Sequence, residues 1–296
     1  MQITALATPA GPVDLYAYTG GKPWSDDAGL PVLVFIHGAL NDHSVWTLPA
    51  RWFAHHGWRV LALDLPGHGR SSGPVQASVA DLAETVLALL GRLGVARAAL
   101  VGHSMGSLIG LEAAARCAGA DAAEQNDNPV QIDHLVLVGT AVPMPVSPAL
   151  LETAARAPLQ AIEMVVSFAH SSLAAKPGNP GPGTWHHGAS RQLMRRVLAR
   201  SAGVAGVAHN LFHHDFSLCN DHAGGLDAAQ RIAAGGRTRS AAILGARDRM
   251  TLPRAAREVC ARLGASVHTL PSAGHELMQE DPEGLLRALR VVLDGR

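Results

Sequence analysis

Two stretches of the chain have the pattern Gly-x-Ser-x-Gly, in which a strained turn between a strand and a helix presents a nucleophilic serine. They are GRSSG around Ser71 and GHSMG around Ser104. The stretch around Ser104 follows the apolar run AALV and precedes the helical sequence SLIGLEAAARC, whereas the stretch around Ser71 follows a PGHG turn and precedes Pro74. Only the stretch around Ser104 lies between a predicted strand and a predicted helix. We therefore predict that Ser104 is the nucleophile and that Ser71 is a loop residue.

A serine hydroxyl is a weak nucleophile unless a base accepts its proton and a third group orients that base. His275 lies between the apolar run SVHTL and the last helical segment, and Asp248 is the first acidic residue after the run SAAIL. The chain order Ser104, Asp248, His275 is the order that such turns use. The alternatives are an ordinary loop histidine, since the chain has 16 His, and a surface ion pair between Asp248 and its neighbouring arginines. We predict a catalytic triad of these three residues.

Acyl transfer also needs N–H donors aimed at the oxygen on which negative charge develops. The N–H of Met105 is one candidate, because it follows Ser104 at the start of a predicted helix. The N–H of Ala39 is the second, in the loop HGAL after the run VLVFI, where Gly38 permits the required backbone geometry. We assign His37 a structural role in holding this loop.

These residues need a sheet whose strands end at one common edge. Continuous apolar runs are typical of strands covered on both faces, and they occupy residues 32–36, 60–63, 98–101, 135–138, 240–244 and 266–270. Helical patterns lie at residues 79–93, 108–117, 253–263 and 282–293. Strands that alternate with helices predict an α/β fold with a mostly parallel central sheet flanked by helices. Residues 2–7 and 13–18 predict a hairpin at the edge of that sheet.

The alternation stops between residues 143 and 236. The pattern there is helical over 150–170 and 191–216, with a Gly- and Pro-rich loop at 177–188. We predict a core of residues 1–142 and 237–296, with residues 143–236 inserted as a helical cap. His209 and His213 lie four residues apart inside this insertion, but without the Glu of an HExxH motif we predict no metal site.

Composition excludes several classes of function. The chain has 296 residues with 24 Lys and Arg against 24 Asp and Glu, so no net basic field exists to hold nucleic acid or anionic lipid. Its 3 Cys exclude a disulfide framework and fit a reducing compartment. No basic start followed by an apolar run marks a signal peptide, and no apolar stretch reaches the ~18 residues of a membrane span. We predict a cytoplasmic protein.

The motifs occur in one order along nearly the whole chain. They are HGALNDHSVW (37–46), DLPGHGRSSG (64–73), GHSMG (102–106), GARDRMTLP (245–253) and AGHELMQEDP (273–282). In this combination the chain resembles the α/β-hydrolase superfamily, in its serine esterase-like branch with an HGx oxyanion loop and a helical cap. The resemblance implies that residues 64–73 form a structural loop. It also implies ester hydrolysis through an acyl-enzyme, with no metal or organic cofactor.

The resemblance places substrate selection in the cap and its rim. The side chains that we predict to bind substrate are those of Leu40, His103, Met144, Phe168 and Phe212. The alternative for each is internal packing. The expected partner is a small or medium-sized carboxylic ester. The same triad would also serve a lactonase, a carbon–carbon bond hydrolase or a cofactor-free perhydrolase, and a receptor that binds without turnover is the alternative of another class.

Overall fold

A computed structural model of the chain describes residues 1–25, 29–118, 130–172 and 185–294. In this part of the chain eight strands form one sheet in the order β1-β2-β4-β3-β5-β6-β7-β8. The strands are β1 (Gln2–Leu6), β2 (Val13–Tyr18), β3 (Val32–Ile36), β4 (Arg59–Asp64), β5 (Arg97–His103), β6 (Gln131–Val138), β7 (Arg239–Gly245) and β8 (Ser266–Leu270).

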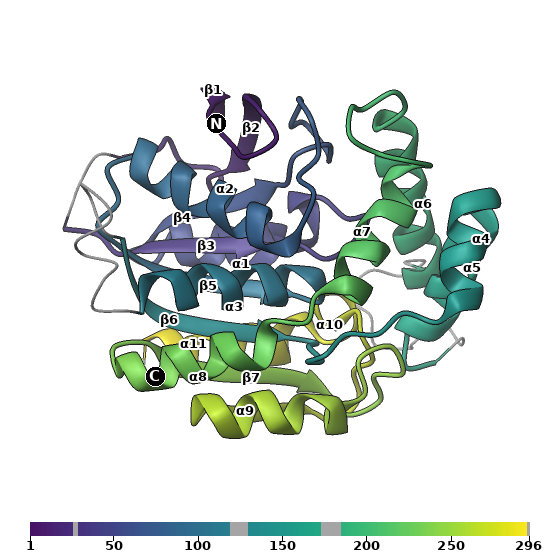
Figure 1. Cartoon of the computed structure of the whole chain (residues 1–296). Helices are drawn as coiled ribbons and strands as arrows, with labels where there is room; N and C mark the ends of the chain where they lie inside the picture. The colour runs from purple at the N-terminus through teal and green to yellow at the C-terminus, as the bar shows by residue number, and fades with distance from the viewer. Residues whose placement is uncertain (26–28, 119–129, 173–184, 295–296) are drawn as a thin grey trace.

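The strands from β4 to β8 pair in parallel, and the two antiparallel pairs, β1–β2 and β2–β4, lie at one edge. The predicted mostly parallel sheet and its edge hairpin are therefore confirmed. The five residues of β3 are all buried, which explains why its sequence shows no polar alternation. Because parallel strands end on the same side, the loops after β3, β5, β7 and β8 meet at one edge (Figure 1).

Helices cover both faces of the sheet. They are α1 (Thr47–Ala54), α2 (Val79–Arg92), α3 (Met105–Cys117), α8 (Gly225–Gly235), α9 (Arg257–Leu263), α10 (Leu277–Glu280) and α11 (Pro282–Asp294), with 3₁₀ turns η1 (His43–Trp46) and η3 (Pro253–Ala256). Helix α3 packs between α2 and α8 on one face, and α1 contacts α11 on the other (Figure 1). Sequence analysis did not predict α1, α8 or α10.

Four further helices lie beyond the carboxyl ends of the parallel strands (Figure 1). They are α4 (Pro148–Arg156), α5 (Pro158–Ala169), α6 (His186–Arg200) and α7 (Leu211–Asp221). The two long helical segments that we predicted are each interrupted. The first breaks at Ala157, whose ψ of 65 is not helical, and the second breaks before Asn210, whose side chain caps α7. Of the predicted loop 177–188, residues 177–184 lie outside the described residues.

Helix α8 falls inside the predicted cap 143–236, yet it packs against the sheet-flanking helices α3 and α9. We therefore propose that the cap ends before α8 and that α8 belongs to the core.

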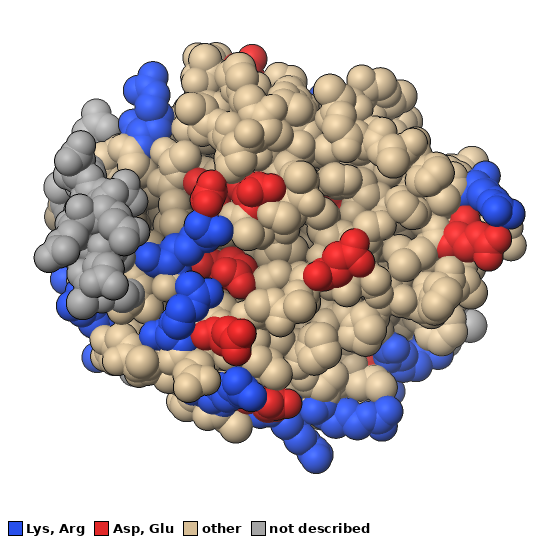
Figure 2. Space-filling view, viewed as in Figure 1, with Lys and Arg blue, Asp and Glu red and all other residues tan. Residues whose placement is uncertain are grey.

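Figure 2 shows acidic and basic side chains next to one another in a few places, mainly toward the lower left, while most of this face carries neither kind. Among the residues that the structure describes, no helix combines the length and the apolar character needed to cross a membrane.

Candidate active site

Ser104 lies on the tight turn between β5 and α3. Its φ of 52° and ψ of −119° are strained for a residue with a side chain, and its N–H donates to the carbonyl of Val138 at 3.0 Å. The flanking glycines make this turn possible. A Cβ on Gly102 would lie 2.1 Å from the carbonyl oxygen of Gly106, so no other residue fits there. The conformation lifts the serine side chain to the edge of the sheet.

Asp248 and His275 come from the loops after β7 and β8 and lie together. The Nδ1 atom of His275 is 2.8 Å from Oδ2 of Asp248. The second carboxylate oxygen, Oδ1, accepts from the N–H groups of Met250 and Thr251 at 2.8 Å each. These two bonds hold the carboxylate in place. A carboxylate held in this way can orient the imidazole, as the acid of a catalytic triad must.

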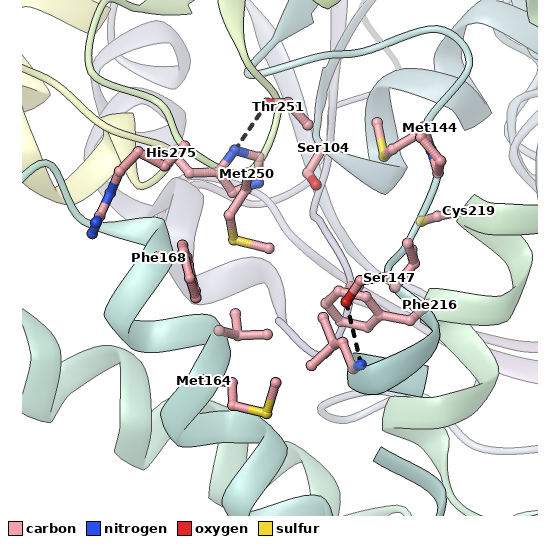
Figure 3. A pocket seen from close by; sticks show the side chains of 16 residues that line it. Ser104, Met144, Ser147, Met164, Phe168, Phe216, Cys219, Met250, Thr251 and His275 are labelled. Atoms are coloured by element: carbon pink, nitrogen blue, oxygen red, sulfur yellow. Dashed lines mark hydrogen bonds between the residues drawn. The ribbon is translucent and has the colours of Figure 1, made fainter. Parts of the chain in front are cut away.

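Thr251 completes this arrangement, and sequence analysis missed it. Its hydroxyl donates to Oδ2 of Asp248 at 2.7 Å and lies 3.1 Å from Nδ1 of His275 (Figure 3). The signal available in the sequence was a hydroxyl residue three positions after the triad acid, where a turn brings it back onto the carboxylate.

The pKa values of the pair shift in opposite directions. Burial opposes the charged form of His275, but the attraction and hydrogen bond of Asp248 outweigh burial and raise the pKa of the imidazole. Burial acts on Asp248 in the direction of a higher pKa. The charge and hydrogen bond of His275, together with the bonds from Thr251, overcome it and lower the pKa of the carboxyl. The couple therefore favours an imidazolium beside a carboxylate, the state that forms during acyl transfer.

Ser104 and His275 line the same cavity (Figure 3). Because Asp248 and Thr251 occupy Nδ1 of His275, the Nε2 atom is the one left for the serine. Within the described residues no hydrogen bond joins the Ser104 hydroxyl to the ring. Such contacts are commonly long in the absence of substrate and tighten when it binds.

The two predicted oxyanion donors flank the serine. Met105 is the first residue of α3, so its N–H has no acceptor within the helix. Ala39 borders the cavity, and within the described residues its N–H donates to no acceptor. A Cβ on Gly38 would come within 3.1 Å of the Ser104 Cβ, which shows how closely the loop approaches the nucleophile.

The buried side chain of His37 contacts the backbone of the loop that contains Gly38 and Ala39. The N–H of Leu65 donates to Nε2 of His37 at 3.1 Å, so the proton of the ring lies on Nδ1, which is 2.8 Å from the carbonyl oxygen of Gly38. Burial lowers the pKa of His37 to about 4, which keeps the ring neutral. The structural role predicted for His37 agrees with these contacts.

A cavity of about 320 Å³ opens at the serine. Its wall is mostly apolar and contains the thioethers of Met144, Met164 and Met250 (Figure 3). The remaining lining residues are Ala39, Ser104, Pro145, Val146, Ser147, Leu150, Val165, Phe168, Phe216, Cys219, Arg249, Thr251 and His275. Of the side chains predicted to bind substrate, Met144 and Phe168 line this cavity.

The other three predicted substrate residues lie behind the wall. Leu40 and Phe212 are fully buried in the core and are not among the described residues that line the cavity. His103 is also buried, and its Nε2 atom is 2.9 Å from the carbonyl oxygen of His275, so it supports the loop that carries His275. Burial lowers the pKa of His103 to about 3. The prediction that these three side chains contact substrate is therefore corrected.

Other polar residues singled out by the sequence have structural partners. The Ser71 hydroxyl donates to the carbonyl of Asp64 at 2.6 Å and accepts from the N–H of Tyr16 at 2.9 Å, so it joins β2 to the loop after β4. His209 precedes α7, and its ring packs edge-on against that of His213, with the ring centroids 4.7 Å apart.

One group of potential metal ligands lies within the described residues, formed by Asp42, His43 and Asp64. The carboxylate of Asp64 already accepts from the N–H groups of His43 and Arg70, at 2.7 and 2.8 Å. Asp42 accepts from Ser44 and from a cap arginine. Internal hydrogen bonds therefore account for these carboxylates without a metal ion.

The family model described as "Alpha/beta hydrolase family" matches residues 33–288. The dihydrolipoyllysine-residue acetyltransferase component of the acetoin cleaving system of Pseudomonas putida is 43% identical over 110 residues, which are 35% of this chain and 29% of that protein. The match thus spans less than a third of that relative's length.

Two solved structures resemble nearly all of the chain. A thermophilic esterase from Thermogutta terrifontis has a TM-score of 0.73 at 19% identity, covering 100% of this chain and 98% of that one. The enol-lactonase from Burkholderia xenovorans LB400 has a TM-score of 0.73 at 20% identity, covering 99% of this chain and 100% of that one. At these identities the likeness shows the fold alone.

Proposed function

The chain belongs to the alpha/beta hydrolase family, and we propose that it is a serine hydrolase that cleaves carboxylic esters of small or medium size through an acyl-enzyme. One observation carries the proposal. Ser104, Ala39 and His275, which Asp248 holds through Nδ1, all border one apolar cavity at the carboxyl edge of the sheet, and within the described residues the N–H of Ala39 has no acceptor. This is the arrangement of base, nucleophile and oxyanion donor that acyl transfer requires.

The proposed reaction has two halves. In the first, Nε2 of His275 accepts the proton of the Ser104 hydroxyl while its oxygen attacks the ester carbonyl carbon. The N–H groups of Ala39 and Met105 hold the resulting oxyanion. When the intermediate collapses, His275 returns the proton to the leaving alcohol. In the second half His275 removes a proton from water as the water oxygen attacks the acyl-enzyme, and it then returns that proton to the Ser104 oxygen as the acid leaves.

The cavity supports a substrate of modest size with an apolar body. Its volume of about 320 Å³ is near the lower end of the roughly 300–1,000 Å³ that small-molecule sites occupy. Methionine side chains are unbranched and adaptable, so the wall tolerates more than one acyl shape. These features favour short and medium acyl chains over long ones.

A panel of p-nitrophenyl esters from acetate to dodecanoate, extended by simple lactones, tests the proposal directly. We expect turnover to be highest for short and medium chains and to disappear in Ser104→Ala. A fluorophosphonate probe should label the wild type but not Ser104→Ala. The matched control is Ser71→Ala, from the second Gly-x-Ser-x-Gly stretch, which should still be labelled. The proposal fails if no ester is cleaved, or if Ser104→Ala retains the label.

A further inference from the structure

A second histidine and aspartate form a buried pair close to the active site. Nε2 of His68 lies 2.8 Å from Oδ2 of Asp215, and both side chains are almost completely buried. His68 belongs to the loop after β4, whereas Asp215 lies on the cap helix α7. The pair therefore joins the cap to the core, and the reaction proposed above makes no use of it.

The same carboxylate also holds the oxyanion loop. The N–H of Leu40 donates to Oδ2 of Asp215 at 2.8 Å, and Leu40 directly follows the donor Ala39. The φ of Leu40 is 51°, a left-handed conformation that a residue with a branched side chain adopts only when its surroundings impose it. The bond to Asp215 is such an imposed contact, because it fixes the peptide that joins Ala39 to Leu40.

We propose that Asp215 is a positioning residue for oxyanion stabilisation: paired with His68, it holds Leu40 in its left-handed conformation and so aims the N–H of Ala39 at the reacting carbonyl. The inference rests on the proposed serine hydrolase function. Asp215 touches no substrate and acts through the backbone of the loop.

The chemistry of the pair suits this task. His68 faces an acceptor at each ring nitrogen, with Nδ1 3.1 Å from the carbonyl oxygen of Pro66. Both nitrogens therefore carry protons and donate. Burial disfavours the charged ring, but the attraction of Asp215 exceeds that effect and raises the pKa of His68. A buried carboxylate is costly without such a partner, so His68 keeps Asp215 ionised as a strong acceptor for Leu40.

Helix α7 also borders the cavity. Phe216, the next residue after Asp215, lines the cavity wall, as does Cys219 one turn further on (Figure 3). The helix that lines this cavity is thus also the helix that holds the oxyanion loop.

The test compares Asp215→Leu and Asp215→Asn with a matched control on the same helix. His214→Ala is that control, since it removes a 2.9 Å bond between α7 and the backbone oxygen of Gln76 without touching Leu40. Loss of one oxyanion donor costs about 10²–10³ in kcat. We expect kcat per fluorophosphonate-titrated site to fall about 10²-fold in Asp215→Leu and about tenfold in Asp215→Asn. KM should stay within about threefold, and the control should keep its kcat within about twofold.

A transition-state analogue separates positioning from general damage. Affinity for a trifluoromethyl ketone should fall in proportion to kcat/KM in the Asp215 variants, while the affinity of a product acid stays unchanged. Equal weakening of both ligands would overturn the proposal. So would an unchanged kcat per titrated site in Asp215→Leu.

Hydrogen exchange tests the contact between Asp215 and the Leu40 amide without relying on ester cleavage. The amide of Leu40 should exchange faster in Asp215→Leu than in His214→Ala or the wild type, because only the first variant removes its acceptor. If the wild type cleaves no ester, the proposed function fails while this result still supports the contact from Asp215 to the loop. If exchange at Leu40 does not change in Asp215→Leu, the inference itself is wrong.

Discussion

Among the residues that the structure describes, two buried His–Asp pairs have the same separation of 2.8 Å, and they differ in what the second ring nitrogen faces. In the pair His275–Asp248, Nδ1 binds the acid and Nε2 remains for the cavity that Ser104 lines. In the pair His68–Asp215, both ring nitrogens face acceptors. A His–Asp pair can therefore act as a base only when one nitrogen is free to take a proton.

The two pairs also differ in how the chain builds them. Asp248 and His275 come from successive loops of the core, 27 residues apart in the sequence. Asp215 and His68 are 147 residues apart and belong to the cap and the core. The first pair is rigidly held at the sheet edge, and the second depends on how the cap docks. We propose that the first pair transfers protons and that the second fixes the geometry of the oxyanion loop.

Replacing the histidine of each pair gives the largest expected effect. We expect His275→Ala to lower kcat by about 10⁵-fold, because the general base is lost. His68→Ala should cost only about 10- to 100-fold, since it weakens the support of one donor. The measurement is kcat on a p-nitrophenyl ester per titrated site, with circular dichroism to verify folding. Losses of equal size would remove the distinction between the pairs.

Replacing the triad acid by its amide tests the tautomer argument. In Asp248→Asn the amide group donates to Nδ1 of His275, which moves the ring proton to Nε2 and prevents that atom from accepting the serine proton. We expect kcat to fall about 10³- to 10⁴-fold at neutral pH. A loss below about tenfold would show that Asp248 is only a neighbour of the base.

The pH profile of the wild type follows from the same pair. The neutral imidazole is the active form, and its pKa lies above the ordinary value of about 6.5 because of Asp248. The value of kcat/KM should therefore rise about tenfold per pH unit below that pKa and level off above it. In Asp248→Asn the inflection should move to lower pH. An inflection at or below 6 in the wild type would contradict the assignment.

The sequence was informative for one pair and silent on the other. Ser104, Asp248 and His275 each follow a recognisable apolar strand, and the order of the loops brings them together at one edge. The acceptor of the Leu40 N–H lies 175 residues away on a helix without any motif. No local pattern in the sequence records such a contact, because it depends on how the cap packs.

The errors in the predicted pocket have the same origin. For an apolar or aromatic residue near the cavity, the sequence alone does not distinguish a side chain that faces a ligand from one that packs in the core. Leu40 and Phe212 face the core, whereas Met144 and Phe168 face the cavity. The fold class was predictable because buried parallel strands and helical periodicity are local signals. The direction of a single side chain in the cap is set by tertiary packing.

A smaller effect on kcat is expected from replacing Thr251. Of the two His–Asp pairs, this residue contacts the pair Asp248–His275. Its hydroxyl bonds Oδ2 of Asp248 and lies beside Nδ1 of His275. Thr251→Val keeps the shape of the side chain but removes this bond, so the carboxylate is held less firmly. We expect kcat to fall about three- to tenfold with little change in KM, and Thr251→Ser should restore most of it. If Thr251→Ser is as slow as Thr251→Val, the hydroxyl does not carry the effect.

The smallest expected effect on turnover concerns Glu276, the residue that follows His275. Glu276 is 5% exposed, and within the described residues no basic side chain forms an ion pair with it. Burial raises its pKa from 4.5 to about 7. Its presence as a carboxylate in turn raises the pKa of His275.

The raised pKa of Glu276 makes the free energy of unfolding depend on pH. Between pH 4.5 and about 7 the unfolded chain loses the proton of Glu276 while the folded chain keeps it, so the free energy of unfolding falls as pH rises through this window. The amide in Glu276→Gln resembles the protonated acid and cannot ionise. We expect Glu276→Gln to match the wild type in stability near pH 4.5 and to exceed it by about 1–3 kcal/mol at pH 8. Chemical denaturation at the two pH values measures this difference, and kcat should stay within about threefold. A stability difference that does not grow with pH would show that Glu276 is already ionised beside His275, and the charge of the catalytic pair would then have to be reassigned.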